Sequence, residues 1–305
     1  MKKNEIIIID SIEKLYHVFD LGDFKHPLIT VLDLSKFEFP KKFESVKFIF
    51  DLYGMSYKNR CAGNLTYGRT HYDFNKGTLN FMGPNQSWII ENVVENESIE
   101  GWGLFFHPDL IRRSHLGKKI KEYTFFGYNL SEALHLSEEE KYILSSLVKE
   151  IEREYSSRID NYSHSVINAT LELLMNYCER FYSRQFITRE NINKDLVENF
   201  ESFLNKRINS SDLEENGIPT VKECANKMCL SPNYLTDLLK KETGKNTQEY
   251  IHLYIIDRAK TMLLNTNDTV GEIAIKLGFE YPDYFSKLFK KKVGINPTKY
   301  RNGII

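Results

Sequence analysis

Basic side chains gather near the C-terminal end of the chain, where four lysines stand within six residues: Lys287, Lys290, Lys291 and Lys292. Ammonium groups on one helix face suit phosphate oxygens, although a merely solvated helix face is the simpler interpretation of a charge run. From Lys240 onward there are 12 Lys and Arg against 7 Asp and Glu, a balance of +5, and because the whole chain carries −1 the remainder carries −6. Such an asymmetry indicates a basic surface on one domain.

The other reactive residues show no spacing typical of a catalytic or metal centre. His71 and His107 belong to no His-x-His pair and to no spaced His–His–Glu set, so each is expected to be hydrogen-bonded or exposed. No Gly-x-Ser-x-Gly motif and no glycine-rich phosphate loop occurs, although a dispersed Ser/His/Asp triad stays open. The cysteines form no Cys-x-x-Cys pair and are expected to be reduced, mostly buried thiols: Cys61, Cys178, Cys224 and Cys229. We therefore expect no catalysis, no metal and no cofactor.

The composition, with 41% hydrophobic and 27% charged residues, is that of a globular protein. No apolar run approaches the roughly 20 residues that span a bilayer. The isoleucine run 6–9 is followed at once by Asp10 and then by Glu13, so it is too short and too acidic for a signal peptide. We expect a cytoplasmic protein without a membrane partner.

Residues 221–251 and 270–301 are two copies of one pattern, which align after one residue is inserted at the turn of the second copy. Identical residues stand at matching places: Val221 and Val270, Ala225 and Ala274, Lys240 and Lys290, Gly244 and Gly294, Tyr250 and Tyr300. A repeat of this length fixes the architecture of the region that contains it.

Each copy predicts two helices joined by a tight turn. A first helix, 221–228 or 270–277, carries a central alanine where two helices must approach closely. A second helix, 232–243 or 282–293, has proline in its first turn, where a missing N–H costs nothing, and its outer face is polar and basic. This is the layout of a helix-turn-helix motif, and two such motifs in register are not chance.

The turns and the inner faces fit the same layout. The turn residues are 229–231 in the first copy and 278–280 in the second, and Gly278 suits a left-handed position at a helix end. Apolar residues form the inner face of each second helix: Leu235, Leu238 and Leu239, and Phe285, Leu288 and Phe289.

Residues 248–264 predict one helix between the two motifs. Its buried side is expected to include Tyr250, Leu253, Ile256, Ala259 and Leu263. Its 17 residues at about 1.5 Å each make a rod of roughly 25 Å. Such a rod can hold two recognition helices near the ~34 Å that separates successive major-groove segments on one DNA face. A single chain could therefore bind two adjacent major-groove segments.

Longer signatures run through this part of the chain. They are residues 230–235 (LSPNYL), 239–244 (LKKETG), 258–260 (RAK), 273–274 (IA), 278–279 (GF), 284–286 (YFS), 289–291 (FKK) and 297–301 (PTKYR). Together they resemble the DNA-binding domain of AraC/XylS-type regulators over residues from about 194 to 302. The resemblance implies a sequence-specific transcription regulator, activator or repressor, that binds double-stranded DNA.

The resemblance also implies which positions face the DNA. They are Asn233, Thr236, Asp237, Lys240 and Lys241 in the first motif, and Pro282, Asp283, Ser286, Lys287, Lys290 and Lys291 in the second. Asn can pair with adenine, Ser or Thr can bond several base edges, and an acid can accept from cytosine N4, whereas the lysines are better suited to phosphates. Asp237 stands where many relatives carry a basic or neutral polar residue. It either pairs with Lys241 four residues on or selects against certain bases.

The pattern of the first 130 residues predicts a β-rich structure. Aromatic and β-branched segments separated by turn residues predict strands at 28–34, 47–52, 70–74, 79–82 and 102–106. The helical period then predicts helices at 136–155, with Ser137 as its N-cap, and at 164–184. A further helix is expected at 194–208, followed by a polar loop at 209–219. The fold class is therefore an α+β protein of two domains, 1–185 and 194–305, with a polar boundary near 185–194.

Residues 72–86 resemble the cupin-like sensing domain of the same regulators. The resemblance implies an N-terminal β-barrel within residues 1–130 that binds a small-molecule effector, and flanking helices at 136–184 that form a homodimer. Residues that could line the effector pocket are Arg60, Tyr67, Trp88 and Trp102. Two alternatives remain: a sensor that acts mainly through protein contacts, for instance with RNA polymerase, and a cupin enzyme with a DNA-binding appendage.

Overall fold

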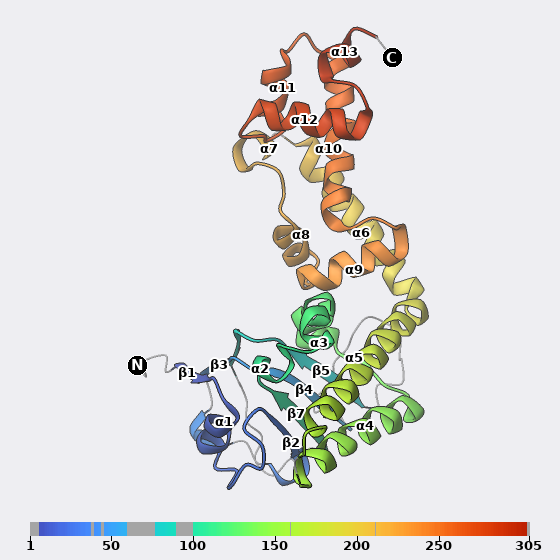
Figure 1. Cartoon of the computed structure of the whole chain (residues 1–305). Coiled ribbons are helices and arrows are strands. Elements are labelled where there is room, and N and C mark those ends of the chain that lie inside the picture. The colour runs from blue at the N-terminus through green and yellow to red at the C-terminus, as the bar shows by residue number, and fades with distance from the viewer. Residues whose placement is uncertain are drawn as a thin grey trace. The chain divides into compact units, whose positions relative to one another are not determined.

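The computed structural model describes residues 6–37, 40–43, 46–59, 77–89, 100–158, 160–210 and 212–303. The chain divides into two compact units, Met1–Thr188 and Arg189–Ile305 (Figure 1). The first unit combines strands and helices, and the second is helical in all its described regular elements. The fold class is thus α+β with a sheet-rich first part and a helical second part.

The first unit contains two sheets. The five-stranded sheet is antiparallel throughout and has the strand order β2 (Ile29–Asp33), β7 (Gly101–Phe106), β4 (Tyr53–Lys58), β5 (Thr78–Met82) and β8 (Leu134–His135). The three-stranded sheet has the order β1 (Ile6–Ile9), β3 (Lys47–Phe50) and β6 (Gln86–Ile89), with β1 parallel to β3 and β3 antiparallel to β6. In the described residues these are two open sheets, so the expected closed barrel is not seen in them.

Four of the predicted strands coincide with β2, β3, β5 and β7, while the strand predicted at 70–74 lies outside the described residues. The β-rich interpretation of the first 130 residues was incomplete, because this stretch also contains α1 (Ile12–Phe19), α2 (Pro108–Ile111) and α3 (His115–Lys119). Helix α1 starts at Ser11, whose hydroxyl accepts from the backbone N–H of Lys14, and it buries Ile12, Leu15 and Phe19. Strand β1, helix α1 and strand β3 share one apolar cluster.

Two long helices, α4 (Glu138–Ser156) and α5 (Ser163–Thr188), pack with the five-stranded sheet into one apolar core. Helix α4 begins, as expected, at Ser137, where Ser137 and Glu140 form a capping box. The hydroxyl of Tyr155 accepts from the backbone N–H of Val31 at 3.0 Å, and burial raises the pKa of Tyr155 to about 12. This bond ties the last turn of α4 to the edge strand β2.

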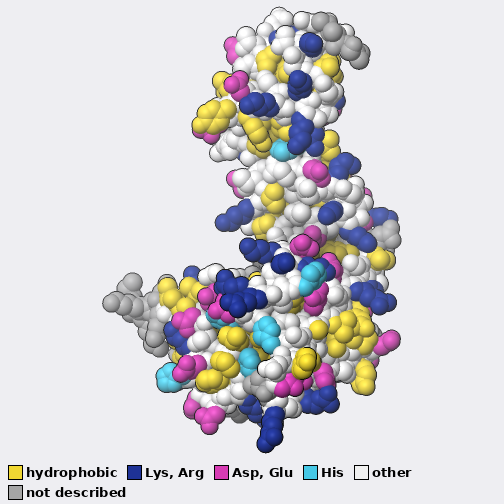
Figure 2. All heavy atoms as spheres, viewed as in Figure 1, with side chains coloured by type: hydrophobic (Ala, Val, Ile, Leu, Met, Phe, Trp, Pro, Cys, Tyr) yellow, Lys and Arg dark blue, Asp and Glu magenta, His cyan; other side chains and the backbone are white. Residues whose placement is uncertain are grey.

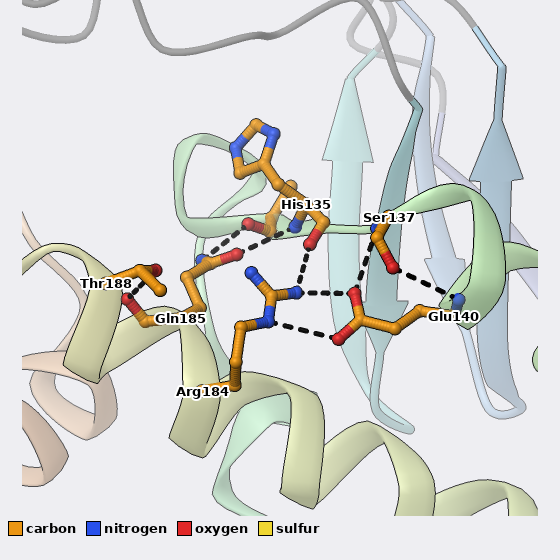
Figure 3. A network of polar contacts seen from close by, with 7 residues as sticks. His135, Ser137, Glu140, Arg184, Gln185 and Thr188 are labelled. Carbon is orange, nitrogen blue, oxygen red and sulfur yellow. Dashed lines mark hydrogen bonds and ion pairs between the residues drawn. The ribbon is translucent and has the colours of Figure 1, made fainter.

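Polar contacts anchor the last turns of α5 to the sheet (Figure 3). Arg184 donates from Nη2 to the backbone oxygen of His135 at 2.7 Å and to Glu140 at 2.6 Å. The buried amide of Gln185 donates to the backbone oxygen of Ala133 and accepts from the N–H of His135, at 3.1 and 2.8 Å. Gln185 thus pairs with β8 much as a neighbouring strand would, and it holds α5 in place up to Thr188.

The second unit begins directly after α5. Its elements are α6 (Glu190–Asn209), α7 (Asp212–Asn216), α8 (Val221–Lys227), α9 (Pro232–Thr243), α10 (Thr247–Asn265), α11 (Val270–Lys276), α12 (Pro282–Val293) and α13 (Pro297–Arg301). The division between the two units, after Thr188, lies within the boundary expected near 185–194. This stretch is helical and not a polar linker, because α5 continues through the buried residues Gln185 and Phe186 and α6 starts at Glu190.

The six apolar residues predicted for the inner faces of α9 and α12 are all buried, from 0 to 7% exposed. Helix α6 packs against α10, where the rings of Phe200 and Tyr250 meet edge to face at 5.8 Å and the Tyr250 hydroxyl donates to Glu201. Among the described helices of the whole chain, none combines the length and the apolar character that crossing a membrane requires.

Candidate nucleic-acid interface

The two helix-turn-helix motifs start in the same way. Helices α8 and α11 each begin at a threonine, Thr220 or Thr269, that forms a capping box with a glutamate three residues later. The central alanines, Ala225 and Ala274, are both 0% exposed, as the close helix crossing requires. Each alanine carbonyl also accepts the N–H that closes the turn, at 2.9 Å in the first motif and 3.0 Å in the second. The shared pattern in the sequence is therefore a shared pattern of hydrogen bonds.

The second helices of the two motifs also end alike. Helices α9 and α12 both have proline at their first position and are both twelve residues long. Each ends at a glycine with a left-handed backbone, Gly244 with φ of 75° and Gly294 with φ of 92°, whose N–H donates to the carbonyl of Lys240 or Lys290. The two motifs thus present helices of equal length, with lysines near equivalent ends.

Most residues predicted to contact DNA lie on the surface of α9 and α12. Those that are exposed are Asn233, Lys240, Lys241, Pro282, Asp283, Lys287, Lys290 and Lys291. Three others are half-buried: Thr236, Asp237 and Ser286. The Thr236 hydroxyl lies 3.1 Å from that of Thr247, so this side chain also joins α9 to the first turn of α10.

The surface around the end of α12 is electropositive. Burial lowers the pKa of His252 on α10, and the ammonium groups of Lys292 and Lys291 lower it further. Nearby cations make a second positive charge unfavourable, and the same field attracts phosphate. Figure 2 shows Lys and Arg side chains at several places on the visible face of the second unit.

Helix α10 connects the two motifs, as predicted, and its bounds differ by one residue at each end from those expected. Its first turn meets α9 through Thr247, and the carbonyl of Leu263 in its last turns accepts from Arg301 of α13 at 3.0 Å. Nineteen residues at 1.5 Å give a length of about 28 Å. The buried side was predicted in part: Ile256, Ala259 and Leu263 are buried, but Leu253 is 38% exposed.

The turn of the second motif packs against residues 213–217, a contact that the sequence did not predict. A Cβ atom on Gly278 would lie 2.6 Å from the backbone oxygen of Leu213 and 2.9 Å from the Cα of Gly217. The segment predicted as a polar loop, 209–219, contains the helix α7. Leu213 of α7 is 1% exposed, and the helix packs against this turn.

Two exposed tyrosines at the beginning of α12 were also missed. Tyr281 and Tyr284 are 64% and 55% exposed, although Tyr281 matches the serine Ser231 in the first motif and Tyr284 matches the buried Tyr234. The alignment of the repeat contained the first signal, the replacement of a serine N-cap by an aromatic residue. The second signal, the exposure of Tyr284, is not visible in the sequence.

Of the four residues predicted to line an effector pocket, the structure describes Trp88 and Trp102. Arg60 and Tyr67 lie outside the described residues. Trp88 is on β6 and Trp102 on β7, in different sheets, and the indole N–H of Trp102 donates to Ser145 of α4 at 3.1 Å. Trp102 therefore faces the helices.

The opposite face of the five-stranded sheet carries a different polar pair. Ser56 on β4 and Asn80 on β5 are register partners, and because side chains alternate along a strand they lie on the face away from Trp102. Within the part of the chain that the structure describes, the buried Oδ1 atom of Asn80 has no hydrogen-bond partner. Such a group costs about 1–3 kcal/mol when it stays unsatisfied, so it requires an explanation.

Histidines and acids do not assemble in the first unit. Across the described ranges, no group of three or more His, Cys, Asp or Glu side chains is placed to hold a metal ion. His71 is outside these ranges, and the Nδ1 atom of His107 accepts from the N–H of Asp109 at 3.2 Å, as an N-cap of α2. His107 is therefore hydrogen-bonded, as expected.

Residues 224–303 match a family model described as a helix-turn-helix domain. The chain is 36% identical over 83 residues to the uncharacterized HTH-type transcriptional regulator YobQ of Bacillus subtilis, covering 27% of this chain and 34% of that protein. It is 25% identical over 177 residues to the HTH-type transcriptional activator RhaR of Mannheimia succiniciproducens, covering 58% and 60%. The C-terminal domain of the response regulator yesN from Fusobacterium nucleatum is 31% identical over 35% of this chain and 98% of that one, with a TM-score of 0.31. The chain spans 11 to 34% of the length of the first three curated relatives.

Proposed function

We propose that this chain regulates transcription by binding DNA sequence-specifically through the AraC-type helix-turn-helix domain of its C-terminal unit. The observation that carries the proposal is the pair of motifs built alike, each with the same capping box, the same turn hydrogen bond and a twelve-residue second helix. The ~28 Å rod of α10 between them is close to the ~34 Å spacing of successive major-groove segments. One chain would therefore read two adjacent segments of the same duplex.

Within this interface the residues divide their roles. Lys240, Lys241, Lys290 and Lys291 toward the ends of α9 and α12, and Lys287 in the middle of α12, bind phosphates, because all five lysines are exposed. Asn233, Asp283 and Ser286 stand in the first half of their helices, from which recognition helices contact base edges. Thr236 and Asp237, being half-buried, position α9 as well as contact DNA.

A binding assay on the full chain tests this function. Purified protein is titrated against duplexes from the region upstream of its own gene and against scrambled duplexes of equal length. We expect selective binding whose affinity falls steeply with salt, with a slope near −0.9 for each phosphate neutralised. Equal affinity for all duplexes at every salt concentration would contradict the proposal and favour a sensor that acts through protein contacts, for instance with RNA polymerase.

We also propose that the chain forms a homodimer through α5. Val166, Ala169 and Leu173 lie at helical spacing on this helix and are all exposed, Val166 to 38% and Leu173 to 45%. Figure 2 shows hydrophobic side chains gathered on the visible face of the first unit, over the region where Figure 1 places α5. The same three residues of a second copy of the chain would cover them.

Light scattering tests the dimer. It should give twice the chain mass, and Leu173→Glu should yield monomers, whereas Tyr142→Glu on the exposed surface of α4 should not.

A small-molecule effector completes the proposal. The Oδ1 atom of Asn80, beside Ser56, has no hydrogen-bond partner among the residues that the structure describes, which supports a site on that face of the five-stranded sheet for a ligand that carries a hydrogen-bond donor such as a hydroxyl group. Thermal unfolding in the presence of monosaccharides and other hydroxyl-bearing metabolites should reveal one that raises the unfolding temperature of the natural chain and not of Asn80→Leu. A compound that stabilises both equally binds elsewhere.

Metal analysis of the purified protein tests the enzyme alternative. Stoichiometric iron, manganese or zinc would favour a metal-dependent cupin enzyme.

A further inference from the structure

We propose that Tyr281 and Tyr284 make the second recognition helix read thymine, through apolar contact with its C5-methyl group. The inference rests on the proposed DNA-binding function and names two base-contacting residues within it. It concerns a difference between the two motifs, which are otherwise built alike, so each motif serves as the reference for the other.

The first difference is at the N-cap. Ser231 is 3% exposed, and its hydroxyl accepts from the N–H of Tyr234 at 3.2 Å. Tyr281 takes this position before α12, is 64% exposed, and forms no side-chain cap bond with any described residue. Because a serine cap stabilises a helix by typically about 1 kcal/mol, the second motif lacks a stabilising contact that the first one has. In its place it presents a phenol ring on the surface.

The second difference is one turn further along. Tyr234 is 5% exposed, whereas Tyr284 at the same place in the repeat is 55% exposed. Beneath Tyr284 lies Phe279, 4% exposed, with the two ring centres 6.0 Å apart. Phe279 replaces the smaller Leu230 of the first motif and is itself held by Phe285 at 5.2 Å. The Tyr284 ring thus packs on Phe279 on one side and is exposed on the other.

The place of the two tyrosines in α12 and the chemistry of their side chains together indicate which group of the DNA they contact. Tyr281 and Tyr284 are the N-cap and third residues of α12, and the first residues of a recognition helix are the ones that contact base edges. In the major groove thymine alone presents an apolar group, its C5-methyl, to an apolar side chain. Tyrosine offers an apolar ring together with a hydroxyl that stays hydrated or bonds a phosphate. The aligned Ser231 and Tyr234 are both buried, so the first motif has no such pair.

The exposed acids Glu280 and Asp283 stand beside the two tyrosines, but the lysines further along the helix favour DNA over a protein as the occupant. The same helix carries three exposed lysines from its middle to its C-terminal end, Lys287, Lys290 and Lys291, so a ligand that covers its length must be negatively charged there. Ile275 on α11 is a further exposed apolar residue of this motif, at 50%, where the first motif has Asn226. A protein that docks on Ile275 and the tyrosines is therefore the competing outcome that the experiment must separate.

The experiment uses the full chain and a duplex that this chain has selected from a random pool. Each thymine is replaced in turn by deoxyuridine, which removes only the methyl group. At one or two positions within the segment bound by the second motif, we expect affinity to fall about fourfold per methyl group, the equivalent of about 0.8 kcal/mol. Tyr281→Ser, which installs the cap of the first motif and so keeps the helix folded, and Tyr284→Ala should each weaken the discrimination at one of these positions, and the double variant should bind the thymine and deoxyuridine duplexes equally. Tyr281→Phe, which keeps the ring, should retain the discrimination.

Two results would overturn the inference. One is equal affinity of the natural chain for every deoxyuridine duplex. The other is full discrimination in the double variant Tyr281→Ser with Tyr284→Ala. If this variant binds DNA normally but fails to alter transcription by purified polymerase, the tyrosines belong to a protein contact. A chain that selects no sequence from the pool fails earlier, at the proposed function itself, so the two failures are distinguishable.

Discussion

Cys229 and Gly278 occupy the same place in the two copies of the repeat, and both have a left-handed backbone, with φ of 57° and 78°. A left-handed conformation costs a residue with a Cβ roughly 1–2 kcal/mol, and glycine nothing. At Gly278 a Cβ would also meet backbone atoms of Leu213 and Gly217 at under 3 Å, whereas Cys229 is exposed. The first motif therefore tolerates a side chain at this turn because Cys229 is exposed, whereas α7 packs against the turn of the second motif.

This pair predicts opposite effects of exchanging the two residue types. Cys229→Gly removes the left-handed strain at an exposed position, and we expect the free energy of unfolding of the second unit to rise by up to about 1 kcal/mol, since glycine's larger chain entropy offsets part of the gain. Gly278→Ala adds both strain and a clash, and we expect a loss of about 2–4 kcal/mol. Urea denaturation followed by circular dichroism measures both. A neutral Gly278→Ala would mean that α7 does not pack against this turn.

The proposed division of roles predicts two kinds of DNA-binding defect. Lys290→Ala should weaken binding to selected and scrambled duplexes alike and reduce the salt slope by about 0.9, because it removes one phosphate contact. Asn233→Ala should cost about 1–3 kcal/mol on the selected duplex only and relax the preference at one base pair. Lys149→Ala, an exposed lysine of α4 in the first unit, is the control and should leave binding unchanged. Equal losses from Lys290→Ala and Asn233→Ala on every duplex would contradict this division.

The second unit was predictable because its signals are local. Proline at the first helical position and a glycine after the last one mark the ends of α9 and α12, whose bounds agree with those expected. The cap Asn246 marks the start of α10, whose bounds differ by one residue at each end. Helix α7 was missed because it is five residues long and polar, and only the contact of its Leu213 with another turn makes it part of the fold. The exposure of Tyr284 likewise depends on Phe279 packing beneath it, which no local pattern records.

The first unit was harder because its pairings are distant in sequence. Strand β1 pairs in parallel with β3, about 40 residues later. Its four consecutive isoleucines are typical of a strand in a parallel pair, but the run without polar alternation did not identify its partner. For Trp102 the sequence indicated an aromatic residue on a strand, but not the face on which it lies, and the face decides whether it lines a pocket or packs on α4. The spacing of Ile12, Leu15 and Phe19 after Ser11 was a usable helix signal for α1.

The stability of the first unit should fall with acid through His26. Its Nδ1 atom accepts from the backbone N–H of Leu28 at 3.1 Å, and burial, followed by the nearby His164, lowers its pKa below the ordinary 6.5. The folded state therefore binds the proton less readily than the unfolded state, so the unfolding free energy is undiminished above about pH 6.5 and falls as the pH drops toward the lowered pKa. In His26→Gln the unfolding temperature should change less between pH 7 and 5 than in the natural chain, and an identical pH profile would rule this out.

The network at the end of α5 should make a measurable contribution to the stability of the first unit. Removing the Arg184 side chain takes one donor from the carbonyl of His135 and one from Glu140, whose side chain is 13% exposed and still accepts from the N–H of Ser137. We expect Arg184→Ala to lower the free energy of unfolding by about 1–2 kcal/mol, less than for a fully buried pair because Arg184 itself is 38% exposed. Arg153→Ala, which breaks the far more exposed pair with Glu150, is the matched control and should cost under about 0.5 kcal/mol. The double variant Arg184→Ala with Glu140→Ala should lose less than the sum of the two single changes. Strict additivity would show that the two side chains do not act as a pair.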